Sequence, residues 1–329
     1  MLLMKNIILT TASLAALLIA GGADATAIRP HAVTSASLTS IPQARPDETA
    51  ADPDPAIVHL QILLDRAGAS PGVIDGFYGE NVSKAVFGFE TLQGLDADGE
   101  LDAEVLNRLK NGAPVLRDYK ITPQDGEDLA DSIPEDYAKM AEMKELGYTS
   151  IAERLAERFH MDEGLLSALN PGSDFAVGET VSVADPGDQV QGKVARIEVD
   201  RKVAQVRSFS EDGTLLAVYP ATIGSEENPA PAGTHEVKGV APMPTYTYNP
   251  DVNFQQGNNT EVLEIAGGPN NPVGSVWIDL SEPTYGIHGT PEPALIDKVG
   301  SHGCVRLTNW DAEELGAMVD PGVTVEFID

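Results

Sequence analysis

The chain has 329 residues, of which 42% are hydrophobic, and its 51 acidic and 21 basic residues give a formal net charge of -30. A chain this acidic is repelled by nucleic acid and by anionic lipid surfaces, so both are excluded as partners. The length suits two or three small domains. Nothing in these figures indicates an oligomeric state.

The first 25 residues have the pattern of an export signal. Lys5 gives a positive start, Ile7–Ala20 an apolar run, and Gly21–Ala25 the small residues typical of a cleavage site. The run is short for a membrane span, and no later stretch reaches ~20 apolar residues. We therefore expect cleavage near Ala25, no stable membrane insertion afterwards, and a location in the periplasm or cell envelope. An uncleaved anchor is the alternative.

Residues 26–54 are rich in Ala, Ser, Thr and Pro and lack hydrophobic periodicity, which predicts a disordered linker. Residues 55–110 contain three segments in which apolar residues recur at helical spacing. The turn-rich "PGVIDGFYG" and "DADG" separate these segments, so we predict a three-helix unit. The apolar residues that define the helices are Ile57, Leu60, Leu63 and Leu64, then Val82, Ala85, Val86 and Phe89, then Leu101, Val105, Leu106 and Leu109.

This helical unit resembles the small peptidoglycan-binding domain found beside many wall enzymes. The segments that carry the resemblance are "LQILLDRAG", "PGVIDGFYGENVSKAV", "GFETLQGL" and "DGELDAEVLNRL". The resemblance implies that the unit binds the peptidoglycan sacculus. A helical module that acts only as a spacer is the alternative.

Residues 111–147 are acidic and predict a connector with a helix in "DSIPEDYAKMAEMKELG". Residues 148–185 predict two short helices and a strand. Ser150 and Glu153 form a capping-box pattern before the first helix, Asp162 caps the second, and the strand lies around Val181–Val183. Through "LNPG" and the preceding helix this segment resembles LysM, a wall-glycan binder. A plain helical hairpin is the alternative.

From about residue 190 to residue 329 the pattern changes to short strands. "VARIEVDRKVAQVRSF" alternates apolar and polar residues around Asp200–Arg201, which is typical of a β-hairpin. Thr308 and Asp311 form a capping pattern for one late helix that ends before Pro321. We therefore predict a multidomain protein whose helical N-terminal part precedes a mainly β domain. The other strand candidates are "TLLAVYPATIG", "GTHEVKGV", "EVLEIAGG", "SVWIDL" and "GVTVEFI".

Cys304, in "SHGCVRL", is the only cysteine of the chain. Oxidising compartments favour paired cysteines, so a single one in an exported chain indicates an intermolecular pair or a free reactive thiol. Buried thiols also serve as small hydrophobic groups. His302, Gly303 and Arg306, however, are not typical neighbours of an inert thiol.

A nucleophilic thiol needs a nearby base, and histidine is the usual one. In an extended segment His302 points parallel to Cys304 rather than toward it. His288, in "YGIHGTPEP", lies sixteen residues upstream and can fold back against the thiol. Gly289 and Gly303 allow close approach of the backbone, so that amides near the thiol can face a developing oxyanion.

Together, "YGIHGTPEP" and "SHGCVRL" resemble the signature of the L,D-transpeptidase catalytic domain of bacterial cell-wall synthesis, and the resemblance extends over Val194–Asp329. It implies that Cys304 attacks the carbonyl before the terminal D-alanine of a tetrapeptide stem and forms a thioester. His288 is then the general base and later the proton donor, and amides around His302–Cys304 hold the oxyanion. No cofactor is implied.

The resemblance also implies roles for the flanking positions. Ser301 and His302 order the loop, and Arg306 either orients a substrate carboxylate or forms a structural ion pair. An amine of a second stem resolves the thioester to a 3-3 cross-link. The sequence leaves the acceptor open among a second stem, an envelope protein, a free D-amino acid and water, and water would make the enzyme an L,D-carboxypeptidase.

Three other interpretations are weaker. A tetrahedral zinc site of His288, His302 and Cys304 has suitable ligand types but no clear fourth ligand. A papain-like protease is disfavoured because its local signature around the cysteine is absent. A non-enzymatic peptidoglycan-binding protein would leave Cys304 without a role.

Overall fold

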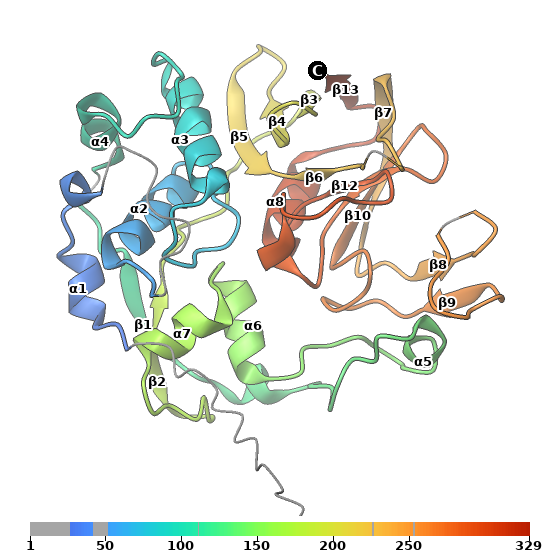
Figure 1. Ribbon diagram of the computed structural model, residues 1–329, viewed down its shortest axis with the longest axis horizontal. Helices are drawn as coiled ribbons and strands as arrows, with labels where there is room; N and C mark the ends of the chain where they lie inside the picture. The colour runs from blue at the N-terminus through green and yellow to red at the C-terminus, as the bar shows by residue number, and fades with distance from the viewer. Residues whose placement is uncertain (1–26, 42–51, 111, 226, 253) are drawn as a thin grey trace, which may run out of the picture.

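The computed structural model describes residues 27–41, 52–110, 112–225, 227–252 and 254–329. A mainly helical half runs to residue 184, and a half built on one large sheet follows (Figure 1). The predicted export signal lies outside the described residues. None of the described helices combines the length and apolarity needed to cross a membrane.

The helical half is organised by local signals at several of its helix ends. Asp54, Asp102 and Asp162 accept backbone N–H groups at the starts of α2, α4 and α7, and Gly94 ends α3 in the left-handed conformation. The elements are α1 (Pro30–Thr34), η1 (Leu38–Ser40), α2 (Pro55–Arg66), α3 (Glu80–Gln93), α4 (Ala103–Leu109), β1 (Leu116–Lys120), η2 (Pro123–Gly126), α5 (Tyr137–Met140), α6 (Ile151–Arg158), α7 (Glu163–Leu169) and β2 (Thr180–Ala184).

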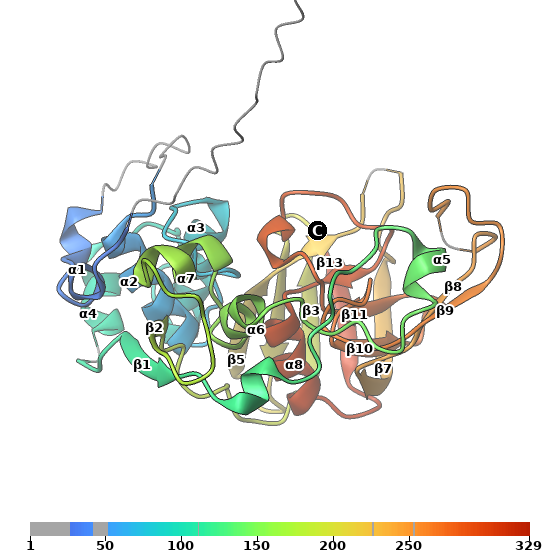
Figure 2. The same cartoon turned by 90° about the horizontal axis from the view of Figure 1, so that it is seen from below.

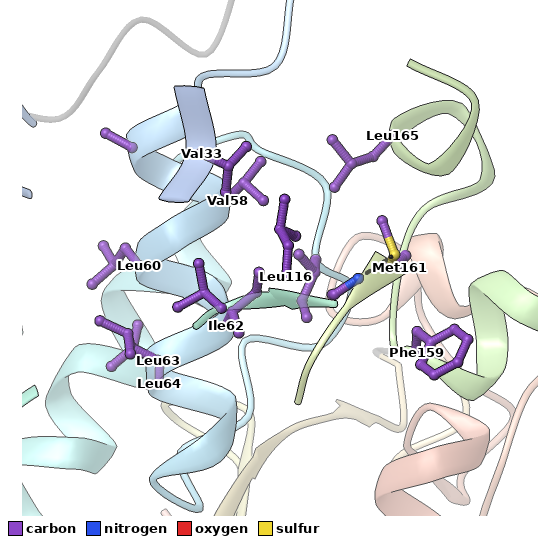
Figure 3. Close-up of a cluster of buried hydrophobic side chains, with 14 of the residues drawn as sticks. Val33, Val58, Leu60, Ile62, Leu63, Leu64, Leu116, Phe159, Met161 and Leu165 are labelled. Atoms are coloured by element: carbon purple, nitrogen blue, oxygen red, sulfur yellow. Dashed lines mark hydrogen bonds between the residues drawn. The ribbon is translucent and has the colours of Figure 1, made fainter. Parts of the chain in front are cut away.

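One hydrophobic core joins all of this half except the segment around α5. Leu60 and Ile62 of α2 are fully buried, and side chains from α1, α3, α4, α6, α7, β1 and β2 complete the cluster. Figure 3 shows Leu116 of β1 and Leu165 of α7 among the side chains around α2. The units predicted at residues 55–110 and 148–185 therefore share a core rather than forming separate domains.

Residues 27–41 correct the prediction of a disordered linker over residues 26–54. Val33, Leu38 and Ile41 are buried in the shared core, and the backbone N–H of Ile28 donates to the carbonyl of Ala168 at 2.8 Å. The composition of residues 26–54, which are rich in Ala, Ser, Thr and Pro, predicted disorder. A few apolar side chains are nevertheless enough to pack residues 27–41 against α2. The disorder prediction for residues 42–51 lies outside the described residues.

The second half is β-rich with one α-helix, as predicted. Its nine-stranded sheet has the order β5-β4-β3-β13-β7-β10-β11-β12-β6, while β8 and β9 form a separate antiparallel hairpin. Thr308 caps the helix by accepting the Asp311 N–H at 3.2 Å, as the capping pattern predicted. The elements are β3 (Arg196–Asp200), β4 (Gln205–Phe209), β5 (Leu215–Pro220), β6 (Thr222–Ile223), β7 (Gly233–Pro242), β8 (Tyr246–Tyr248), β9 (Leu263–Ile265), β10 (Val276–Leu280), β11 (Gly286–His288), η3 (Pro293–Leu295), β12 (Val305–Arg306), α8 (Asn309–Met318) and β13 (Thr324–Ile328).

Residues 111–147 correct the prediction of a helical connector. β1 pairs antiparallel with β2, with Leu116 opposite Ala184, so the unit predicted at residues 148–185 begins near residue 116. The predicted helix shrinks to the four residues of α5. The reason is tertiary, because Met140 and Leu146 pack on the β8–β9 hairpin instead of sharing one helical stripe.

The two halves meet along α8 and the edge strand β5. α3 packs against β5, and Ala69 forms a parallel β-bridge with Val218 of that strand. Edge strands are open to unwanted pairing, so the helical half also protects the sheet. Three side-chain contacts cross at α8: Ser70 Oγ donates to Asp311 Oδ2 at 3.0 Å, the His160 and Trp310 rings stack with centroids 5.1 Å apart, and Asn309 Nδ2 donates to both Glu157 carboxylate oxygens at 3.0 Å.

Candidate active site

The candidate site forms where two short strands run parallel. β11 and β12 pair with Ile287 opposite Val305 and His288 opposite Arg306. Alternate residues of a strand share one face, so Cys304, which directly precedes Val305, lies on the face of His288 and Arg306. The structure thus brings the predicted base and nucleophile to the same side of the sheet.

His288 is buried and held in one tautomer. Its Nδ1 lies 2.6 Å from the carbonyl oxygen of Gly289. Because a carbonyl only accepts, Nδ1 carries the proton and Nε2 is the unprotonated nitrogen. Burial and the positive charge of Arg306 lower the pKa of His288 to about 4, so the imidazole is neutral near pH 7.

The Cys304 thiol is also neutral at rest. Burial raises its pKa, while an amide hydrogen bond from Gly286 and the charge of Arg306 oppose that effect. Its Sγ lies 3.7 Å from the carbonyl oxygen of Thr284. A neutral thiol on the same face as a neutral imidazole is suited to deprotonation by a general base at the moment of attack.

The loop before the thiol has its own constraints. Ser301 Oγ donates to the Cys304 carbonyl at 2.6 Å, and the Ser301 N–H donates to the carbonyl of Gly224 at 2.9 Å. Gly303 has φ +105°, and a Cβ there would lie 2.7 Å from Tyr285 Cε1. Glycine is therefore required at this position by both conformation and space.

Asn309 leaves no space for a side chain at Gly289. A Cβ at this position would overlap the Oδ1 of Asn309. The same Oδ1 accepts the N–H of Ser275 at 3.0 Å, so Asn309 ties α8 to the backbone that follows β11. Since Gly289 supplies the carbonyl that fixes His288, this packing bears directly on the orientation of the base.

His302 and Arg306 occupy different surroundings. The His302 ring stacks on Phe254 with centroids 3.9 Å apart. Arg306 Nε is buried and has no hydrogen-bond partner among the described residues, and its charge acts on Cys304, Glu292 and Tyr137. A buried guanidinium with an unused donor is suited to bind a substrate carboxylate.

A cavity of about 470 Å³ adjoins this face. Its lining includes Tyr246 of β8, Thr284 and Trp277, and the Trp277 ring stacks on His288 with centroids 5.5 Å apart. The volume is that of a small-molecule or short-peptide site. A larger cavity of about 570 Å³ lies between residues 71–82 and η3, and none of the predicted site residues lines either cavity. The 470 Å³ cavity adjoins the site through Trp277, which stacks on His288, and through Thr284, whose carbonyl oxygen lies 3.7 Å from Cys304 Sγ.

The structure does not support the zinc site considered for His288, His302 and Cys304. Within the described ranges, no three His, Cys, Asp or Glu side chains gather as a metal ion would require. The His302 ring, one of the three candidate ligands, is instead stacked on Phe254.

Three further residues near the site were not predicted from the sequence: Trp277, Tyr137 and Asn309. Trp277 lies opposite His288 in the antiparallel pair of β10 and β11. Pairing "SVWIDL" with "YGIHG" as a hairpin would have found it, because the apolar alternation of the first segment was already recognised. Tyr137 and Asn309 carry no comparable sequence signal, since distant segments bring them to the site.

A thiol and a neutral imidazole on one face of the sheet, beside a cavity, are suited to cysteine-dependent acyl transfer. Residues 195–327 match the family model described as "L,D-transpeptidase catalytic domain". Residues 53–109 match the one described as "Putative peptidoglycan binding domain". The chain therefore contains an L,D-transpeptidase catalytic domain and, before it, a peptidoglycan-binding domain.

Two curated relatives share this similarity. The Bacillus licheniformis protein named "Putative L,D-transpeptidase YkuD" is 28% identical over 177 residues, which cover 53% of this chain and 90% of that protein. Its Bacillus subtilis namesake is 47% identical over 122 residues, which cover 37% of this chain and 59% of that protein. The chain thus spans about three fifths of the Bacillus subtilis relative.

A solved structure titled "L,D-transpeptidase from Mycobacterium smegmatis" is 18% identical, and the match covers 47% of this chain and 65% of that chain. The TM-score of 0.34 is too low to support any structural inference.

Proposed function

We propose that Cys304 carries out acyl transfer on the tetrapeptide stems of peptidoglycan. The Sγ attacks the carbonyl that precedes the terminal D-alanine, while its proton passes to Nε2 of His288. The C–S bond forms, the C–N bond breaks, and His288 returns the proton to the departing D-alanine amine. The observation that carries this proposal is the parallel pairing of β11 and β12, which aligns His288, Arg306 and Cys304 on one face.

The loop supplies the remaining electrostatics. The transition state needs donors aimed at the developing oxyanion, and the backbone amides of His302–Cys304 are the nearest candidates. Gly303 lets this backbone turn at φ +105°. Arg306 is proposed to bind the D-alanine carboxylate, because its buried Nε has no partner among the described residues.

The thioester is then resolved by an acceptor. The side-chain amine of a second stem attacks the thioester carbonyl and transfers a proton to His288, which then reprotonates the departing thiolate. The product is a 3-3 cross-link. With an amine of an envelope protein the product is an anchored protein, and with water it is a shortened stem.

The N-terminal half is proposed to bind the wall. The match over residues 53–109 supports this, and Phe77 and Tyr78 line the 570 Å³ cavity on that segment together with acidic groups. We also propose a LysM-like role for the unit closed by β1 and β2. A cleaved export signal and a location in the cell envelope belong to the same proposal.

The test is incubation of the full chain with tetrapeptide muropeptides, followed by mass spectrometry of the products. Released D-alanine with cross-linked dimers supports transpeptidation, whereas shortened monomers alone indicate the carboxypeptidase. Cys304→Ala is the control and should abolish both. D-alanine release by a folded Cys304→Ala variant would exclude the thioester mechanism.

A further inference from the structure

The β8–β9 hairpin stands apart from the nine-stranded sheet. A two-stranded hairpin is marginally stable by itself, so it needs a hydrophobic partner. Tyr248 and Ile265 are fully buried against Met140 and Leu146. These last two belong to residues 127–147, which we call the strap. Both views place α5 of the strap beside β8 and β9 (Figures 1 and 2).

Hydrogen bonds fasten the end of the strap to the segment after β9. The Leu146 N–H donates to the Gly267 carbonyl, and the Leu146 carbonyl accepts the Asn270 N–H, both at 3.0 Å. A Cβ on Gly268 would overlap the Leu146 backbone, so the two segments are in direct contact. The strap therefore belongs by sequence to the wall-binding half but by packing to the catalytic half.

A second set of bonds joins the strap to the loop between β8 and β9. Gln256 Oε1 accepts the Tyr137 N–H at 3.2 Å, and Gln256 Nε2 donates to the Glu135 carbonyl at 2.8 Å. Asn259 Nδ2 donates to Asp136 Oδ1 at 3.1 Å. Side chains of the loop thus bind it to α5 and to the residues just before α5.

Tyr137 extends this contact to the reacting groups. Its ring makes edge-on contacts with Tyr246, Tyr248 and Phe254, at centroid distances of 6.0, 5.3 and 6.1 Å. Phe254 in turn stacks on His302, two residues before the thiol. Tyr246 lines the 470 Å³ cavity.

We propose that Tyr137 is a positioning residue for the transpeptidase reaction, through which the wall-binding half holds the β8–β9 hairpin over Cys304. This proposal rests on the function proposed above. The ring does not touch the reacting atoms. It keeps Tyr246 and Phe254 in place, so that the stem-peptide cavity is already shaped before substrate binds.

The test compares Tyr137→Ala and Tyr137→Phe in the full chain. Loss of the ring should raise KM for a tetrapeptide stem about tenfold with a smaller change in kcat, because several aromatic contacts are lost. Tyr137→Phe should restore the wild-type KM. Iodoacetamide should alkylate Cys304 at least as fast in Tyr137→Ala, since the loosened hairpin exposes the thiol. Lys139→Ala, exposed on the same helix, is the matched control.

Gln256→Ala provides a second route to the same loosening. It should raise KM in the same direction, and its effect should not add to that of Tyr137→Ala. If Tyr137→Ala does not fold, the KM of Gln256→Ala is the measurement that tests the proposal. An unchanged KM in the folded variants would overturn the proposal. Failure of the wild-type chain to release D-alanine would instead overturn the proposed function, and the alkylation rates would still report on the strap.

Discussion

The charges of individual residues define the resting state of the site. Burial lowers the pKa of His288 and raises the pKa of Cys304, and both effects favour the neutral forms. The pair therefore differs from a preformed thiolate and imidazolium. In such a site both side chains are neutral before the reaction. The thiolate and the imidazolium form only when the thiol attacks the acyl group.

The acidic limb of the pH profile should reflect this. His288 is proposed to act as a base in its neutral form, and its lowered pKa keeps that form dominant above about pH 4. The limb of kcat/KM is therefore expected near pH 4, instead of near 6.5 as for an ordinary histidine. Steady-state kinetics from pH 3.5 to 8 measure it.

Arg306→Gln is the informative companion, because Arg306 helps to lower the pKa of His288. The acidic limb of kcat/KM should lie at higher pH in Arg306→Gln than in the wild type, even if kcat itself falls. A wild-type limb near 6.5 would show that His288 is not the base or is not buried in solution.

The sequence predicted that His288 and Cys304 lie near one another, and the structure places them on one face of the sheet, but the sequence did not predict their surroundings. The spacing of His288 and Cys304, with glycines beside each, allowed one to fold back on the other. The stacking of Trp277 on His288 depends on which strand lies next to β11, and a single sequence does not specify strand neighbours. The roles of Ser301, His302 and Arg306 stay predictions that kinetics must test.

At the scale of elements, α6 connects the two halves through one buried carboxyl group. Glu157 of α6 accepts hydrogen bonds from Asn309 of α8 and from the Tyr148 hydroxyl. Burial raises the pKa of Glu157 to about 7. The folded protein therefore binds a proton there that the unfolded chain releases above its ordinary pKa of 4.5.

Stability should fall as pH rises through this region. The contribution of Glu157 is fully present below about 4.5 and is lost as pH passes 7, because the folded-state pKa is the higher one. Glu157→Gln keeps an acceptor without the charge. It should raise the free energy of unfolding at pH 8 by about 1–2 kcal/mol and change it little at pH 5.

Urea unfolding at the two pH values measures this difference. Glu104→Gln, on the surface of α4, is the control. Because its ion pair with Arg108 is exposed, this change should alter the free energy of unfolding little and by the same amount at both pH values. Equal destabilisation by Glu157→Gln at both pH values would mean that the carboxyl group is ionised in the folded protein.

Local signals predicted elements better than long-range ones did. The caps at Ser150, Asp162 and Thr308 lie where the sequence placed them, because capping involves residues only two or three positions apart. β1 was missed because its partner, β2, lies some sixty residues later. The long helix predicted around α5 failed because the β8–β9 hairpin competes for the same apolar side chains.

At the scale of the whole molecule, the helical half has one shared hydrophobic core. Its core draws on segments from residue 28 to residue 184. The sequence predicted an arrangement of separate modules, since each has its own periodicity, but periodicity does not reveal which modules share a core.

A fragment of residues 27–184 should therefore unfold in one transition. A fragment of residues 55–110 leaves Leu60 and Ile62 without β1 and α7, and it should be several kcal/mol less stable or unfolded, because each lost core contact costs on the order of 1 kcal/mol. Circular dichroism in urea measures both. Two transitions in the longer fragment, or equal stability of the shorter one, would restore the picture of separate modules.

The contacts along α8 have a mechanical consequence. Ser70, His160 and Glu157 all contact this helix directly, so the helical half is joined to the domain that carries Cys304 by packing as well as by the chain. A flexible tether lets a catalytic domain reach substrates over a range of distances from the anchoring point. A rigid connection restricts it to substrates at one distance. If the helical half binds the wall as proposed, the molecule would select stems at one fixed offset from that contact, and the shape of the protein would set the spacing of the products.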